Sequence, residues 1–374
     1  MTGMDEAWRE SRLKLLFLHR DLPPESYTGV AVQVHRLANA LADMGHEVSV
    51  YSQSAKPADA RYRLLPIRLA GLKSCLRLLP GLKRLWYPLW YRTLDFRGYD
   101  AVHIHGDGGF LNYRANFVRT FYGTAAMEFR YARSLKGKLA QGLSYWLERR
   151  EAGRCRMCVG ISPHVAAHLP GVVHVVPCML GSEPDLRLPT KTPFPSLVYL
   201  GSRHSRKRGE VALDLFLALR TRHPDLRLAY VGPAAETTEL RRRPEYAGVD
   251  FHSGLAQAEL DALYRRSWIY LCLSSYEGFG VGIIEAMAFS CLVATTPHPG
   301  SEYLIRDGEN GLLARPGEEE TVLARALGDA GMRLRITDAA REFSRRFAPR
   351  AVASDYLELY RRLRRPHGEA VPWR

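Results

Sequence analysis

The stretch Ser274–Gly300, SSYEGFGVGIIEAMAFSCLVATTPHPG, decides the fold that we expect for this chain. An apolar strand is expected just before it, at 269–273, and a glycine turn follows at 278–280. The turn leads into a helix expected at 281–289, and a second apolar strand is expected at 292–296. Strand, glycine turn, helix and strand in this order form the repeating unit of a parallel α/β sheet.

The glycine turn and the two glutamates beside it indicate a ligand that contains a phosphate. The N-terminal end of a helix presents backbone N–H groups and partial positive charge, so it favours a phosphate, and glycine lets the backbone approach a ligand. Glu277 lies in the loop and Glu285 eight positions later on the helix, and carboxylates accept paired sugar hydroxyls. A nucleotide sugar, with its phosphate between two sugars, suits this arrangement. The alternative is an ordinary surface turn with two solvated glutamates.

The same segment resembles the Glu-x7-Glu motif of the family 4 retaining glycosyltransferases. The resemblance continues through EYLI at 302–305 and DGENGLL at 307–313, which are similar to the family's run E-x-I-x-D-G-x-N-G-L-L. It implies the GT-B fold, an α/β architecture in which two Rossmann-like domains face each other across a cleft and a C-terminal helix crosses back to the first domain. It also implies that Glu285 accepts the ribose hydroxyls of a nucleotide sugar and Glu277 those of the transferred sugar. The backbone N–H groups expected to meet the sugar and phosphate are those of Gly278, Phe279, Gly280 and Val281.

A strand, a helix and a second strand are expected between Leu13 and Ser52, in the same α/β pattern. The sequence there is similar to the family's G-G-x-x-x-H-V-x-x-L-A followed by G-H-E-V-x-V. Thr28 replaces the first glycine of that motif and Gln33 replaces its histidine. Gly29 is therefore our candidate for close approach to the donor phosphate.

Two further strands are expected to carry residues of the acceptor side. The strand at 100–105 ends at His105 and is followed by Asp107, and ligand loops lie at the carboxyl ends of strands in open α/β sheets. An aspartate in a surface glycine turn is equally ordinary. The strand and its exit at 117–123, FVRTFYG, resemble the family's T-x-H-G element, in which a histidine lines the acceptor side. Tyr122 stands at that position, where it can donate a hydrogen bond but cannot titrate near neutral pH.

A basic loop, GSRHSRKRG at 201–209, precedes a helix expected at 210–222 and suits a diphosphate. It resembles the family's Gly-Arg…Lys-Gly loop. Counting forward from the first glycine of the loop selects Lys207, whereas counting back from the last selects Arg208. We favour Arg203 and Lys207 as the residues that stabilise the departing diphosphate, and a solvated basic loop is the alternative. Because these cations can replace a metal and no carboxylate cluster resembles a metal site, we expect no metal and no cofactor.

The expected domains follow from the repeated pattern. Residues 1–182 form the N-terminal acceptor-binding domain, 183–350 the nucleotide-sugar-binding domain, and 351–374 the C-terminal helix and tail. The boundary lies in the proline-containing, apolar-poor stretch at 183–196. Two helices, at about 318–330 and 336–347, are expected to precede the last one.

Composition and charge indicate the kind of partner. The chain has 374 residues and a net charge of +14, which favours anionic partners. The stretch 61–92 contains no acid and interleaves Lys and Arg with leucines and aromatics, so it resembles an interfacial element on anionic lipid. A helix and loop packed on its own domain is the alternative, and no motif indicates nucleic acid. No long apolar run or signal-peptide core occurs, so we expect a cytoplasmic protein, peripheral on the inner face of the membrane if 61–92 binds lipid.

The function that we expect is metal-independent transfer of a sugar from a nucleotide sugar to a glycan, lipid-linked or small-molecule acceptor. Retention of the anomeric configuration is implied by the resemblance alone. Two alternatives stay open: a nucleotide-sugar epimerase on the same fold, and a non-catalytic protein that binds sugar nucleotides or membranes. Tyr122 and the altered loop at 178–182, where Cys178 replaces the asparagine usual in the family, motivate the second.

Overall fold

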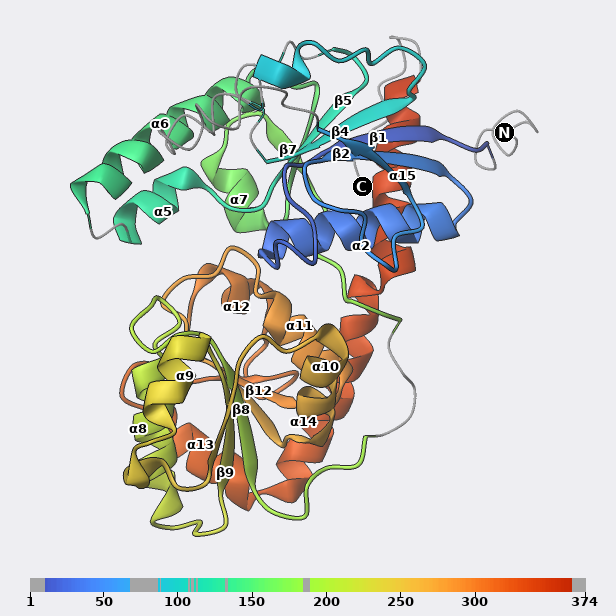
Figure 1. Ribbon diagram of the computed structural model, residues 1–374. Helices are drawn as coiled ribbons and strands as arrows, with labels where there is room; N and C mark the ends of the chain where they lie inside the picture. The colour runs from blue at the N-terminus through green and yellow to red at the C-terminus, as the bar shows by residue number, and fades with distance from the viewer. Residues whose placement is uncertain are drawn as a thin grey trace. The chain divides into compact units, whose positions relative to one another are not determined.

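The structure is a computed structural model that describes residues 11–67, 87, 89–106, 108, 111, 114–131, 134–183 and 189–364. The chain divides into two compact units. Unit 1 contains the residues up to Met179 together with those from Pro349 onward, and unit 2 is the continuous stretch Leu180–Ala348 (Figure 1).

Unit 1 is built on a seven-stranded parallel sheet with the strand order β3-β2-β1-β4-β5-β6-β7. Its strands are β1 (Lys14–Leu18), β2 (Glu47–Ser52), β3 (Arg63–Pro66), β4 (Ala101–His105), β5 (Phe117–Phe121), β6 (Met157–Gly160) and β7 (Val172–Val175). The helices whose bounds the structure describes in the chain up to Met179 are α2 (Gly29–Asp43), α5 (Ala125–Tyr131), α6 (Leu135–Ala152) and α7 (Pro163–His168). The central strands β4, β5 and β6 are buried along their whole length, as expected for a parallel sheet covered on both faces.

Unit 2 repeats the architecture with a six-stranded parallel sheet in the order β10-β9-β8-β11-β12-β13. Its strands are β8 (Ser196–Leu200), β9 (Arg227–Val231), β10 (Val249–His252), β11 (Ile269–Cys272), β12 (Leu292–Thr295) and β13 (Leu312–Leu313). Its helices are α8 (Gly209–Arg220), α9 (Ala234–Leu240), η2 (Pro244–Tyr246), α10 (Gln257–Arg266), α11 (Val281–Ala288), α12 (Pro299–Leu304), α13 (Glu319–Gly328), α14 (Ala330–Ser344) and η3 (Arg345–Phe347). Helices α8, α9 and α13 cover one face of the sheet, and α10, α11 and α14 cover the other (Figure 1). Helices on both faces of a parallel sheet in this strand order define a Rossmann-like unit.

The last helix, α15 (Pro349–Arg364), belongs to unit 1, as expected. It packs against α2 (Figure 1), and the buried side chains of its inner face join the core of unit 1. These side chains are Val352, Ala353, Tyr356, Leu357, Leu359, Tyr360 and Leu363. Polar bonds reinforce the contact: Tyr360 Oη lies 2.6 Å from His103 Nδ1, and Tyr356 Oη lies 3.0 Å from Thr120 Oγ1. Buried polar groups with partners of this kind fix one packing arrangement.

Several details differ from the sequence expectations. The helix expected from Ile336 begins at Ala330 instead, because the Asp329 side chain accepts a bond from the Met332 N–H and starts a new helix where α13 ends. Helix α12 was not expected in the proline-containing stretch after β12. Its Pro299 occupies the first turn, where a missing N–H costs nothing.

The conspicuous run DGENGLL builds the turn that leads into β13. Asn310 is 5% exposed, and its side chain accepts from the Arg306 N–H and donates to the Leu304 carbonyl. Asp307 accepts from the N–H of Leu313 in the strand. The left-handed Gly308 (φ +74°) makes the reversal. The run therefore positions an edge strand of unit 2.

The basic stretch 61–92 is described only in part. Arg63–Pro66 form β3, the edge strand that pairs in parallel with β2. Residues 68–86 and 88 lie outside the described residues, and the prediction that the stretch binds lipid stays a prediction. Of the helices that the structure describes, none has the length and apolarity needed to cross a membrane.

Candidate functional site

The strand order of unit 2 reverses between β8 and β11, and the loops that follow these two strands meet there. The chain leaves β8 toward β9 on one side and leaves β11 toward β12 on the other. Such a switch point opens a crevice at the carboxyl ends of the strands, where ligands of open α/β sheets bind. The loop after β8 is the basic loop at 201–208, and the loop after β11 contains Glu277 and the glycine turn.

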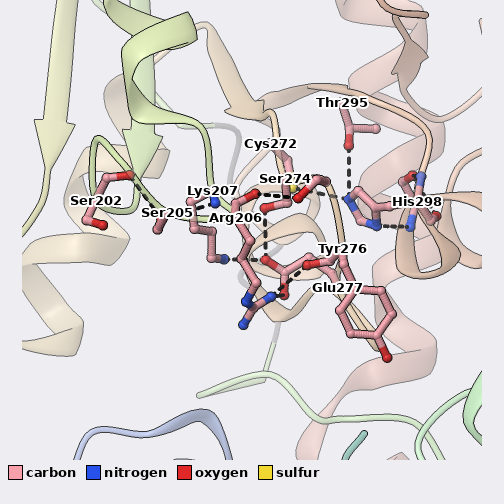
Figure 2. Close-up of polar contacts among 12 residues, drawn as sticks. Ser202, Ser205, Arg206, Lys207, Cys272, Ser274, Tyr276, Glu277, Thr295 and His298 are labelled. Carbon is pink, nitrogen blue, oxygen red and sulfur yellow. Dashed lines mark hydrogen bonds and ion pairs between the residues drawn. The ribbon is translucent and has the colours of Figure 1, made fainter. Parts of the chain in front are cut away.

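Lys207 and Glu277 form the central contact of this site. Lys207 Nζ lies 2.5 Å from Glu277 Oε1, and Ser274 Oγ donates to the same oxygen at 2.9 Å (Figure 2). Burial alone would raise the pKa of Glu277, but the charges of Lys207 and Arg206 and the hydrogen bonds outweigh it, so the pKa is lowered. Glu277 is therefore a carboxylate at neutral pH, with a cation held beside it.

Arg206 joins the two loops and was not among the predicted site residues. Its guanidinium donates to the Tyr276 carbonyl at 2.6 Å and lies 3.4 Å from Glu277 Oε2 (Figure 2). Its own carbonyl accepts from the Ser275 N–H at 2.8 Å. The sequence signal was present, because Arg206 is one of four Lys and Arg residues in the loop, but spacing alone did not separate it from its neighbours.

Gly201 allows Lys207 to approach the strand end. A Cβ atom at Gly201 would lie 2.5 Å from Lys207 Cβ and 2.5 Å from the Tyr199 hydroxyl, closer than carbon atoms pack. Arg208, the alternative cation for this position, has a left-handed backbone (φ 58°). Its guanidinium lies 3.9 Å from Glu319 Oε1 and not beside Glu277. Of the two residues that sequence counting left open, Lys207 is thus the one beside Glu277.

Arg203 lies at the start of the same loop, and its described hydrogen bonds are to Glu236 and not to Glu277. Its backbone N–H donates to both carboxylate oxygens of Glu236, at 2.8 and 2.9 Å. Its Nε is buried and has no hydrogen-bond partner among the described residues. A cation whose buried Nε is an unpartnered donor suits an anionic ligand, and the role of Arg203 toward a diphosphate stays a prediction.

Helix α11 begins directly at the glycine turn. Gly280 has φ +100° and is the N-cap, a conformation that favours glycine. The Phe279 side chain is 2% exposed and packs near Phe347, so only its backbone is available to a ligand. One turn into the helix, Glu285 is 6% exposed. A role in donor binding stays a prediction for Glu285 and for the backbone N–H groups of residues 278–281.

His298 supports the site from the loop that follows β12, where it is the N-cap of α12. Its Nδ1 accepts from the Ser301 N–H at 3.0 Å and caps α12, which leaves the proton on Nε2, 3.4 Å from Thr295 Oγ1 (Figure 2). Burial lowers the pKa of His298 to about 4; the charges of Lys207 and Arg206 add to this effect and that of Glu277 opposes it. His298 is therefore a neutral cap and not a general acid at neutral pH.

Wild-type protein is expected to lose more stability in acid than the variant His298→Asn. Between the ordinary histidine pKa of 6.5 and about 4, the unfolded chain binds a proton that the folded site rejects, so stability falls as the pH falls through this window. The shift corresponds to about 3 kcal/mol, and Asn can keep the cap. Urea unfolding at pH 7 and pH 4 measures both proteins; equal losses would contradict the neutral, buried histidine.

In unit 1, His105 and Tyr122 lie together at the ends of β4 and β5. His105 Nδ1 is 2.9 Å from the Tyr122 hydroxyl, and His19 Nδ1 contacts the His105 carbonyl. Burial, with the charges of nearby His103, His19 and Arg119, lowers the pKa of His105, and burial raises that of Tyr122. Both side chains are therefore neutral, and Tyr122 can donate but not abstract a proton near pH 7. Asp107 lies outside the described residues.

Tyr122 also lines a pocket of about 560 Å³ that lies wholly within unit 1. An ion pair forms part of its wall, with Arg119 Nε 2.5 Å from Glu151 Oε2 and both side chains almost fully buried. Two further carboxylates line it, Glu128 of α5 and Glu148 of α6, and Glu148 accepts from the Ala125 N–H at 2.8 Å. Sequence reasoning missed this pocket, because glutamates on a surface helix resemble an ordinary solvated face.

Gly29 is the first residue of α2, and Thr28 caps the helix by accepting from the Ala31 N–H at 3.3 Å. A Cβ atom at Gly29 would meet nothing within 4 Å, so unit 1 itself does not require glycine there. Gln33, at the place of the family's histidine, exchanges two hydrogen bonds with the Met179 backbone, at 2.8 and 2.9 Å. Gln33 thus ties α2 to the end of unit 1, while the role of Gly29 toward a phosphate stays a prediction.

The fold has counterparts among known proteins. A sucrose-phosphate synthase from Thermosynechococcus elongatus aligns over 94% of this chain and 99% of its own, with a TM-score of 0.73 and 19% identity. WaaG, a glycosyltransferase involved in lipopolysaccharide biosynthesis, aligns over 92% and 99% with a TM-score of 0.70 and 16% identity. These similarities establish the GT-B fold, with two Rossmann-like units and a C-terminal helix returned to the first.

Sequence comparison gives the family. The profile "Glycosyltransferase Family 4" matches residues 27–180, and "Glycosyl transferases group 1" matches residues 186–343. The D-inositol 3-phosphate glycosyltransferase of Corynebacterium glutamicum (strain R) is 24% identical over 89% of this chain and 91% of its own length. The chain is an enzyme that transfers a sugar from a nucleotide-sugar donor. It belongs to family 4 of the glycosyltransferases, a retaining family, as the Glu-x7-Glu segment predicted.

Proposed function

We propose that the loops after β8 and β11 bind the diphosphate and the transferred sugar of the donor. The observation that carries this proposal is the contact between Lys207 and Glu277 at the switch point of the unit 2 sheet. Lys207, a cation, lies beside Glu277, an acceptor for hydroxyl groups. Glu277 comes shortly before the N-terminal end of α11, which favours a phosphate. Glu277 receives sugar hydroxyls, and Glu285 receives those of the ribose.

In this proposal, Lys207 and Arg203 stabilise the negative charge that develops on the departing diphosphate, which is commonly the largest contribution to catalysis. Arg206 holds the two loops together through Glu277 and the Tyr276 carbonyl. Such cations can act in place of a metal ion, so we propose a metal-independent reaction. Within the described part of the chain, no group of three metal-ligating side chains comes together.

The pocket of unit 1 is our candidate for the acceptor site. Its carboxylates Glu128 and Glu148 accept hydroxyl hydrogens and repel anions, which favours the uncharged, hydroxylated end of a glycan, lipid-linked or small-molecule acceptor. Tyr122 orients an acceptor oxygen by donating a hydrogen bond. Because neither Tyr122 nor His105 is a base near pH 7, an oxygen of the donor phosphate is our candidate for the base.

A panel of nucleotide sugars tests the donor site directly. The protein is expected to gain about 2.7 kcal/mol in stability with its own donor at one hundred times the dissociation constant, seen as a rise in the unfolding temperature. UDP-, GDP-, ADP- and dTDP-sugars are compared with their free diphosphates, and metal chelation is expected to leave the gain unchanged. A panel in which no nucleotide stabilises the protein would contradict the donor site.

A further inference from the structure

Helix α6 presents a row of large apolar side chains to solvent. Leu135, Leu139, Leu143 and Trp146 are 74%, 67%, 50% and 53% exposed. Their spacing of four, four and three residues aligns them along one face of the helix. We name these four side chains the α6 ridge. Single exposed apolar residues are ordinary, but a continuous row marks an interaction surface.

The charges around the α6 ridge are positive. The stretch 125–152, which contains α5 and α6, holds six Lys and Arg residues and three glutamates. Lys138 and Arg149 are exposed at positions that flank the ridge, and the Arg150 guanidinium lies 5.7 Å from the centre of the Trp146 ring.

The three glutamates of the same stretch are engaged elsewhere. Glu128 and Glu148 line the pocket of unit 1. Glu151 is buried against Arg119. The α6 ridge is therefore both apolar and basic, a combination that complements a negatively charged, amphipathic surface.

We propose that the α6 ridge docks on the surface of an anionic lipid bilayer, with α6 lying in the plane of the interface. The leucines would enter the boundary between headgroups and acyl chains, Trp146 would lie at headgroup level, and the Lys and Arg side chains would meet lipid phosphates. A second copy of this chain is a poorer partner for the ridge, because a symmetric contact would bring two sets of the same cations together.

The other face of α6 gives this docking a consequence for the substrate. Gln141, Ser144 and Glu148 from that face line the pocket of unit 1, about half a helical turn away from the ridge. Docking would therefore hold the pocket close to the membrane, where it can receive the hydroxylated headgroup of a lipid-borne acceptor. This last step rests on the proposed acceptor site; the docking itself does not.

Vesicle co-sedimentation of the full chain tests the docking without any sugar donor. Wild-type protein is expected to bind vesicles of phosphatidylcholine with phosphatidylglycerol, to bind pure phosphatidylcholine weakly, and to bind less as salt is raised. The variant L139Q/L143Q/W146Q is expected to bind at least about tenfold more weakly. Leu334→Gln removes a leucine that is 66% exposed on α14 of unit 2, and this matched control should bind like wild type. A charge variant, K138E/R149E, should lose the preference for the anionic lipid.

Three outcomes would overturn the docking. The first is wild-type protein that does not bind anionic vesicles. The second is a pair of ridge and charge variants that bind like wild type and keep the wild-type unfolding temperature. Lipid binding would in that case belong to another segment, such as 61–92. The third is wild-type protein that does not bind lipid and is oligomeric by light scattering, while the ridge variant is monomeric. That result would assign the α6 ridge to self-association. Vesicle binding combined with a flat nucleotide panel would keep the docking and remove the proposed donor site.

Discussion

Replacing Lys207 by methionine is expected to lower kcat by about 100- to 1000-fold at saturating donor, the loss typical of removing one preorganised electrostatic contact. Methionine keeps most of the length of the side chain and removes its charge. In the structure that charge lies 2.5 Å from Glu277, at the carboxyl ends of β8 and β11. The departing diphosphate would develop its negative charge next to it. The measurement is turnover with the donor that the nucleotide panel selects.

The matched control for this variant is Arg222→Met. Arg222 pairs with Glu320 on the exposed surface of the same unit, so its loss removes a cation of unit 2 away from the site and should leave kcat within about twofold of wild type. Because Lys207→Met leaves Arg206 as the remaining cation beside Glu277, its unfolding temperature is measured alongside. A folded Lys207→Met protein with wild-type kcat would mean that the diphosphate leaves elsewhere.

Replacing Glu285 by glutamine is expected to weaken donor binding by about 10- to 100-fold. A carboxylate that accepts ribose hydroxyls makes charged hydrogen bonds worth about 1.5–3 kcal/mol each, and a neutral amide makes weaker ones. Glu285 is 6% exposed on α11, so water competes little for its oxygens. Isothermal titration with the free nucleoside diphosphate and with the complete nucleotide sugar measures the effect.

Comparing those two ligands separates the roles of the two glutamates. If Glu285 binds the ribose, its variant should lose affinity for both ligands, because both contain the ribose. A loss confined to the nucleotide sugar would instead place Glu285 on the transferred sugar. Glu302→Gln, on the exposed side of α12, is the control and should bind both ligands like wild type.

Much of unit 2 could be predicted from the sequence, because its signals are local. The apolar strands are buried, the glycine turn gives Gly280 its left-handed backbone, and α11 begins where expected. The choice between Lys207 and Arg208 could not be made from spacing. It depends on the left-handed backbone at Arg208 and on the space above Gly201, which are properties of the folded loop.

Unit 1 was harder to predict because its site is assembled from distant segments. The pocket combines residues near Thr28, Gly106 and Tyr122 with one face of α6. In sequence, Glu148 and Glu151 resemble ordinary helix-surface residues, and only the fold shows that they face inward. The sequence also drew attention to 61–92 as a membrane element, whereas the exposed apolar row that the structure describes lies on α6.

The return of α15 to unit 1 has a consequence for the order of folding during synthesis. All of unit 2 is translated between the first 179 residues and the helix that completes their core. While the ribosome extends the chain, the cavity that Tyr356 and Tyr360 will fill stays open beside α2 and the central strands. Unit 2, in contrast, has its whole sequence before α15 emerges. The second unit to be translated can therefore be the first to reach its native state, and the core of unit 1 is completed only when α15 leaves the ribosome.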